Sequence, residues 1–250
     1  MAKRSRKYQE MLSLVDRTKQ YDLAEAIALA KKTHYAKFDA TVELTFRLNL
    51  DPRQAEQNLR GAIVLPHGSG KSQSVLVLAQ GDHLKAAEEA GADYFGNEEY
   101  LEKIKNGWLD FDVLVATPDM MKDLGRFGKL LGPRGLMPNA KTGTLTMDIG
   151  RAVKEIKAGK VEYRVDKNGN IPFSVGKISF EEQKLAENIK AVYELMVRSR
   201  PSTVKGVYVK NVALSTTCLL YTSDAADDLL CVDLGGRRLL KKKNKQKKEK

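Results

Sequence analysis

Two patterns of apolar and polar residues occur along the chain, and each predicts a different kind of sheet. Residues 41–50, TVELTFRLNL, place apolar side chains at every second position from Val42 to Leu50. Such alternation is typical of a strand with one buried and one polar face. Between about 68 and 159, the apolar runs VLVLA and FDVLVAT are separated by the helical segments DHLKAAEEAGA and EEYLEKIKNG. Strands that alternate with helices predict a parallel sheet with helices on its faces.

The alternating pattern returns after residue 160. Strand-like VEYRV and IPFSV flank an Asn-Gly pair, which predicts a hairpin because both residues tolerate positive φ. The segment SFEEQKLAENIKAVYELMVRSRP predicts a helix, with Ser179 and Glu182 at the spacing of a capping box. Its apolar face is expected to consist of Leu185, Ile189, Val192 and Met196. KGVYVKNVALSTT then predicts a last strand.

The first and third sections share one style, and the middle section has another. The predicted fold is therefore mixed α/β and α+β with two domains. Residues 1–67 and 160–217 form a discontinuous α+β domain, and residues 68–159 form an inserted Rossmann-like α/β domain. Two connections then cross between the domains and could act as a hinge. The predicted hinge residues are Pro66, Gly68, Gly70 and Gly159.

The first of these connections, LPHGSGKS, ends like a phosphate-binding loop. A Walker A motif, G-x-x-x-x-G-K-[ST], needs a glycine where this chain has Leu65, and Pro66 has no N–H to donate. The following QSVLVLA is strand-like, whereas the motif needs a helix. A nucleotide-binding enzyme is the alternative function, but a glycine-rich turn between two strands fits these residues better.

Composition narrows the possible functions. No apolar run approaches the roughly 18 residues needed to cross a bilayer, and the basic start lacks the apolar region of a secretory signal. The two cysteines, Cys218 and Cys231, and three dispersed histidines predict neither a metal site nor a disulfide scaffold. The net charge is +11, of which residues 1–217 carry +7, and this excess favours a polyanionic partner.

Several motifs resemble the large-subunit ribosomal protein L-one family, in its bacterial style. They are LPHGSGK, EEAGADYFG, DFDVLVATPDMM, GRFGKLLGPRGLMPNAKTGT, IKAGKVEYRVDKNGNI and KLAENIKAVYELM, in that order. The resemblance runs from about residue 3 to Thr217. It implies a cytoplasmic, ribosome-bound protein that is not an enzyme, needs no cofactor or metal, and is a monomer when free.

The resemblance also implies partners. The discontinuous domain would grip a stalk region of large-subunit ribosomal RNA, and the stalk would assist release of deacylated transfer RNA. The protein would also bind the leader of its own messenger RNA and repress its translation. A repressor that acts away from the ribosome remains an open alternative from sequence alone.

RNA contacts carried over by motif fall on polar and aromatic residues of the discontinuous domain. Lysine and arginine suit phosphates, and hydroxyls suit ribose 2′-OH groups. The expected RNA-binding residues are Lys37, Phe38, Thr41, Glu43, Arg164, Asp166, Lys167, Ser179, Ser215, Thr216 and Thr217. On local pattern alone, polar strand residues would be solvated and Phe38 would belong to the core.

Two segments keep alternatives open. GRFGKLLGPRGLMPNAKTGT could cradle phosphate with Arg126, Lys129, Arg134 and Lys141, but a structured loop is favoured. Residues 218–250 depart from the family pattern, and seven of the last ten residues are lysine. We expect this tail to be disordered or an artefact of sequence assembly, with a genuine basic RNA-binding tail as the alternative.

Overall fold

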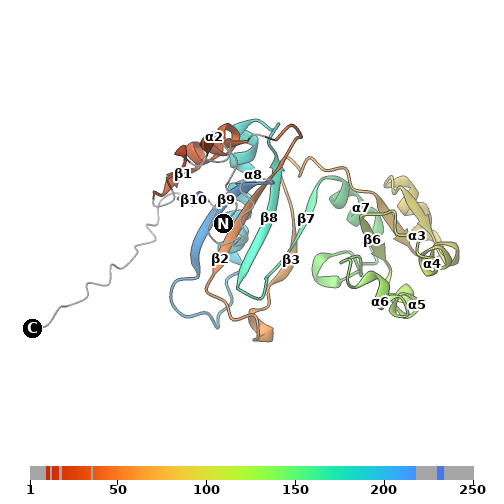
Figure 1. Ribbon diagram of the computed structural model, residues 1–250. Coiled ribbons are helices and arrows are strands. Elements are labelled where there is room, and N and C mark those ends of the chain that lie inside the picture. Colours follow the sequence, from red (N-terminus) through yellow and green to blue (C-terminus); the bar gives the residue numbers. More distant parts are fainter. Residues whose placement is uncertain (1–9, 12, 17–18, 35, 218–229, 234–250) are drawn as a thin grey trace, which may run out of the picture.

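The computed structural model describes residues 10–11, 13–16, 19–34, 36–217 and 230–233. They form a mixed α/β structure with one sheet of five strands, one of three and one of two. Figure 1 shows the five-stranded sheet and the three-stranded sheet as separate groups of elements, with the chain passing between them twice.

The five-stranded sheet is built from the two ends of the described chain. Its order is β1-β10-β9-β2-β8, and β2 pairs antiparallel with both of its neighbours, β9 and β8. Helices α2 and α8 pack against one face through a shared core. The elements are β1 (Tyr21–Asp22), α2 (Leu23–Thr33), β2 (Thr41–Leu48), β8 (Asn170–Lys177), α8 (Glu182–Arg198), β9 (Val209–Thr216) and β10 (Leu230–Asp233).

Strand β2 explains how this sheet acquires two different faces. Val42, Leu44, Phe46 and Leu48 are all buried, whereas the residues between them are exposed or half-buried. The buried set meets Ala26 and Ile27 of α2 and the apolar side of α8. The alternation in the sequence therefore predicted the two faces of β2 correctly. Its apolar residues lie under the helices, and its polar residues lie on the uncovered face.

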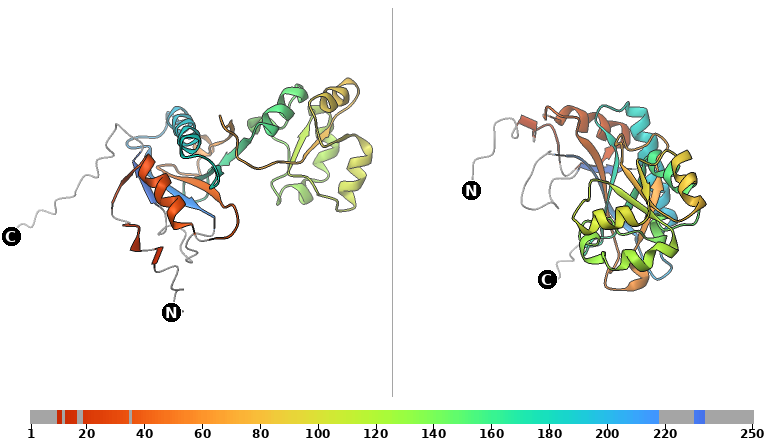
Figure 2. Two further views of the ribbon diagram at one scale, coloured as in Figure 1. Left: turned by 90° about the horizontal axis from the view of Figure 1, so that it is seen from above. Right: turned by 90° about the vertical axis from the view of Figure 1, so that its right-hand side faces the viewer.

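The three-stranded sheet is parallel, with the order β5-β4-β6. All four residues of β4 are buried, because helices cover both faces. The left view of Figure 2 shows α3 and α7 on one side of this sheet and the other helices on the opposite side. The elements are β4 (Val75–Leu78), α3 (Asp82–Glu89), β5 (Tyr94–Gly96), α4 (Glu98–Lys105), β6 (Val113–Ala116), α5 (Met121–Gly125), α6 (Gly128–Leu131) and α7 (Ile149–Lys157).

A two-stranded ladder joins these groups. Strand β3 (Arg60–Val64) pairs antiparallel with β7 (Lys160–Arg164), from Arg60 opposite Arg164 to Val64 opposite Lys160. The chain leaves β3 towards the three-stranded sheet and returns from α7 into β7. One end of each connection is therefore attached to this pair of strands.

Three local features differ from the sequence-based expectations. The capping box is absent: α8 begins after Glu181, which makes no side-chain cap bond, and Ser179 lies outside the helix. The short strand β5 was not predicted, since its three residues give no usable period. Of the tail that was expected to be disordered, residues 230–233 form β10, paired with β9 and β1, and the rest lies outside the described residues.

Candidate nucleic-acid interface

The uncovered face of the five-stranded sheet carries a row of polar side chains across three strands. Glu43 on β2 lies opposite Ser174 on β8 and Ser215 on β9. All three are half-buried. A carboxylate between two hydroxyls offers acceptors and donors in one row, which suits recognition of hydroxyl and amino groups.

A second row lies nearer the start of β2. Thr41 pairs with Lys177, whose Nζ donates to Thr41 Oγ1 at 3.1 Å and to the Asp39 carbonyl at 3.3 Å. Thr217 donates its backbone N–H to the Thr41 carbonyl at 2.9 Å and its hydroxyl to the same oxygen at 3.3 Å. These bonds fix the positions of a cation and two hydroxyls at this end of the face.

The loop before β2 extends the same end. Both oxygens of Asp39 hold Ser179, accepting from its backbone N–H at 3.1 Å and from its hydroxyl at 2.8 Å. Phe38 is 50% exposed, so it is not a core residue, and its ring meets His34 edge-on at 6.3 Å. The exposed Lys37 precedes it. An exposed aromatic beside a lysine can stack on a ribose or base while the lysine meets a phosphate.

The hairpin between β7 and β8 lies at the opposite end of the face. Gly169, at φ +77, closes it by donating to the Asp166 carbonyl at 3.0 Å, and this is the predicted Asn-Gly turn. Arg164, Asp166 and Lys167 are all exposed there. Since β2 has eight residues, the two ends are roughly 20–25 Å apart. The predicted residues therefore follow the length of one sheet face.

Thr216 does not share this face. It pairs with Val42 and is 4% exposed, because strand alternation turns its side chain to the covered side between Ser215 and Thr217. Among the described residues its hydroxyl has no hydrogen-bond partner. A role in direct RNA contact is incompatible with this burial.

Some residues of the face were missed from the sequence. Ser174 and Lys177 were not singled out, because their places beside Glu43 and Thr41 depend on the pairing of β8 with β2. Arg47, exposed and opposite Asn170 and Asn211, belongs to the same polar set of β2. Its alternation with Phe46 and Leu48 predicts this side of the strand, although Arg47 was not among the expected RNA-binding residues.

A cleft of about 400 Å³ lies between this face and the elements around the three-stranded sheet. Thr41, Glu43 and Ser174 line it from the sheet. Gly135, Leu136, Met137 and Thr144, from the loops after α6, line it from the other side. The connections contribute Ser69, Lys71, Gln73 and Lys160. The cleft thus brings together polar residues that are far apart in the sequence.

The two connections touch each other at glycines. A Cβ on Gly159, which has φ +96, would lie 2.6 Å from Gly68 Cα and 2.8 Å from Ser69 N. Fully buried Asn188 of α8 holds the first connection: it accepts from His67 N–H at 3.1 Å and donates to the carbonyls of Gly68 at 3.1 Å and Val175 at 2.8 Å. Of the other predicted hinge residues, Pro66 is exposed and Gly70 has φ +70.

LPHGSGKS runs from β3 to β4, so it connects two strands as predicted. The residues directly after Ser72 lead into strand β4 and not into a helix. The Lys71 N–H donates to the Ser69 hydroxyl at 3.4 Å. The geometry of a Walker A loop is therefore not present here.

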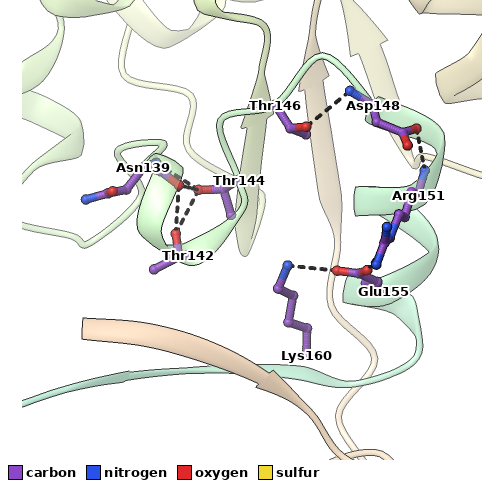
Figure 3. Close-up of polar contacts among 8 residues, drawn as sticks. All are labelled: Asn139, Thr142, Thr144, Thr146, Asp148, Arg151, Glu155 and Lys160. Atoms are coloured by element: carbon purple, nitrogen blue, oxygen red, sulfur yellow. Dashed lines mark hydrogen bonds and ion pairs between the residues drawn. The ribbon is translucent and has the colours of Figure 1, made fainter. Parts of the chain in front are cut away.

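The second connection is held by a charge cluster (Figure 3). Lys160 at the start of β7 pairs with Glu155 Oε2 of α7 at 3.0 Å, and Arg151 bonds Oε1 of the same carboxylate at 2.8 Å. The hydrogen bond from Lys160, and then the one from Arg151, lowers the pKa of Glu155 below its ordinary value. A Cβ on Gly143 would lie 2.8 Å from Lys160 Nζ, so the loop packs closely on this ammonium.

The glycine-rich segment of residues 125–144 folds into short helices and turns. Asn139 caps the turn of residues 140–142 by accepting from Lys141 N–H at 2.8 Å, and Thr144 donates to the Asn139 carbonyl at 3.3 Å. Figure 3 shows this compact turn beside Lys160. Its four cationic side chains, Arg126, Lys129, Arg134 and Lys141, are exposed. The segment is therefore a structured loop, as favoured from the sequence. Its four cationic side chains are accessible to a phosphate.

Within the described ranges, no group of three or more His, Cys, Asp or Glu side chains could hold a metal ion. The same part of the chain contains no helix that is both long and apolar enough to cross a membrane.

Comparison with known families identifies a family to which this chain is similar. The model of the ribosomal protein L1p/L10e family matches residues 30–218, well over half of the chain. The match runs from the last turn of α2 to just beyond β9, and so includes the whole three-stranded sheet, strands β2, β8 and β9, and every residue of the polar face.

Proposed function

Since the chain belongs to the ribosomal protein L1p/L10e family, and is therefore a cytoplasmic ribosomal protein of the large subunit that binds ribosomal RNA, we propose that it binds this RNA through the uncovered face of its five-stranded sheet. The observation that carries the proposal is the placement of ten of the eleven expected contact residues. Thr41, Glu43 and Ser215 lie in register on this face, and the other seven lie at its two ends. Thr216 is the exception and is left out.

The face has the chemistry that RNA requires. Lys37, Lys167 and Arg164 are exposed cations for phosphates, and Phe38 is an exposed ring for stacking. Ser215, Thr41 and Thr217 supply hydroxyls to ribose 2′-OH groups, which distinguish RNA from DNA. Glu43 accepts from a 2′-OH or a base amino group.

The fold supports a division into two domains. Residues 1–67 and 160–217 would form the RNA-gripping domain, and residues 68–159 an inserted Rossmann-like domain with its own parallel sheet and its own core. Pro66, Gly68, Gly70 and Gly159 lie on the connections between them. The inserted domain would turn about this crossing.

On the ribosome, the protein would bind a mobile stalk and assist the release of deacylated transfer RNA. Free protein would be a monomer and would bind a similar structure in the leader of its own messenger RNA, repressing translation. Because one face would bind both RNAs, a protein bound to the ribosome could not also bind the messenger RNA. Only surplus protein would then repress its own synthesis.

Competition between the RNAs tests the proposal. The stalk fragment of large-subunit RNA and the messenger leader are titrated at fixed salt, beside a scrambled RNA of the same length. Each specific RNA is expected to displace the other and to bind more tightly than the scrambled RNA. Equal affinity for all three RNAs would contradict the proposal.

Glu43→Ala sharpens this test. Loss of an acceptor between Ser174 and Ser215 is expected to weaken specific binding about tenfold, or about 1.4 kcal/mol. Binding to scrambled RNA should not weaken, because removal of a negative charge costs no phosphate contact. Glu194→Ala, at an exposed position of α8, is the matched control and should behave as wild type.

A further inference from the structure

The first connection is held in place where it passes the polar face. Asn188 fixes its backbone at His67 and Gly68 through the hydrogen bonds described above. Two residues later the chain lies against the end of β8, because a Cβ on Gly70 would be 2.8 Å from Lys177 Cγ and 3.0 Å from the Phe180 ring. Lys71 follows at once and lines the cleft with Thr41, Glu43 and Ser174.

The charged side chains of the cleft fall into two classes. Lys160 is paired with Glu155 at 3.0 Å, Glu162 with Arg60 at 3.8 Å, and Asp112 accepts from Ser74 N–H at 2.9 Å and from its hydroxyl at 3.0 Å. Within the described part of the chain, the Lys71 ammonium and the Glu43 carboxylate have no hydrogen bond or ion pair. One cation and one anion therefore remain for a ligand.

We infer that this cleft is a subsite for one ribose–phosphate unit of the bound RNA, with Lys71 contacting the phosphate and Glu43 accepting from the 2′-OH. A ribose–phosphate unit carries an anion that suits the Lys71 ammonium and a hydroxyl donor that suits the Glu43 carboxylate. The cleft of about 400 Å³ lies within the roughly 300–1,000 Å³ typical of ligand sites. The subsite rests on the proposed RNA binding and extends the contact surface from the sheet to the first connection.

Asn188 acts as a positioning residue for this subsite. It joins the carbonyl of Gly68 to that of Val175, the neighbour of Ser174 on β8, so the backbone at Gly68 is tied to the sheet three residues before Lys71. The GSGK sequence thus serves to deliver a lysine to RNA and does not form a loop around a nucleotide.

The test is a salt titration of binding to the stalk fragment of large-subunit RNA. Lys71→Gln is expected to weaken binding roughly three- to tenfold at low salt and to reduce the slope of log K against log salt by about 0.7–0.9, one phosphate contact. Lys71→Arg should keep the wild-type slope. Lys105→Gln, on α4 and not among the residues that line the cleft, controls for net charge and should change neither quantity.

The outcomes separate the subsite from the proposed function. Wild-type protein that binds the stalk fragment no better than scrambled RNA would contradict RNA recognition itself. Specific wild-type binding, with Lys71→Gln equal to wild type in affinity and slope, would overturn the subsite alone. An equal loss of slope in Lys71→Gln and Lys105→Gln would also overturn it, because the effect would then follow from net charge.

Discussion

The two main sheets of this protein differ in how many of their faces are covered. The five-stranded sheet has α2 and α8 on one face and polar side chains on the other, so neighbours along β2 alternate between core and surface. The three-stranded parallel sheet has helices on both faces, and every residue of β4 is buried. Only the first sheet can present a row of strand side chains to RNA, and the second can contribute only through its loops.

Core substitutions should expose this difference most strongly. On β2, Phe46→Ala is expected to lower the free energy of unfolding by about 3–5 kcal/mol, whereas Thr45→Ala should cost well under 1 kcal/mol. On β4, both Leu76→Ala and Val77→Ala should cost roughly 2–4 kcal/mol, since each faces a different core. Urea denaturation measures all four. A Thr45→Ala cost as large as that of Phe46→Ala would contradict the uncovered face.

The joint between the two groups is the next place to test. Gly159→Ala combines positive-φ strain with a clash against the backbone of Gly68 and Ser69, and should cost roughly 2–4 kcal/mol. Gly107→Ala is the matched control, because Gly107 has φ +92 but nothing within 4 Å of the added Cβ. It should cost only about 1–2 kcal/mol. Equal costs in urea denaturation would mean that the contact between the connections is not needed.

The smallest expected effect concerns the charge cluster at the second connection. The pKa of Glu155 is lowered mainly by Lys160, so its stabilising contribution is complete above the unfolded-state value near 4.5 and is lost as pH falls through the folded-state value. Glu155→Gln should therefore destabilise by at most about 1 kcal/mol at pH 7 and by less at pH 3. Urea denaturation at both pH values checks this, with Glu194→Gln as control. A destabilisation as large at pH 3 as at pH 7 would point to packing rather than charge.

Much of the fold could be predicted because it depends on local periodicity. The apolar alternation of β2, the helical spacing of α8 and the Asn-Gly turn at Gly169 all lie where the sequence places them. Ser179 shows the limit of such patterns. Its spacing from Glu182 suggested a cap, but its hydroxyl binds Asp39, 140 residues earlier in the chain. No local pattern can anticipate a partner at that distance.

The polar face shows the same limit. Alternation alone could have placed Ser215 and Thr217 on one side and Thr216 on the other, and the structure does so. Ser174 and Lys177 could not have been found this way, because their roles depend on the register of β8 against β2. Register is a property of two strands together, and the sequence of either strand leaves it open.

The sequence by itself determined most of the strands and helices, which side of β2 is apolar, and which family the motifs resemble, because each depends on residues that are near one another in the chain. Only the tertiary structure decided what those segments meet. It set Glu43 between two serines, buried Thr216, brought Gly68 against Gly159, and placed Lys71 in a cleft with the polar face. These contacts follow from the packing of segments that are not neighbours in the chain.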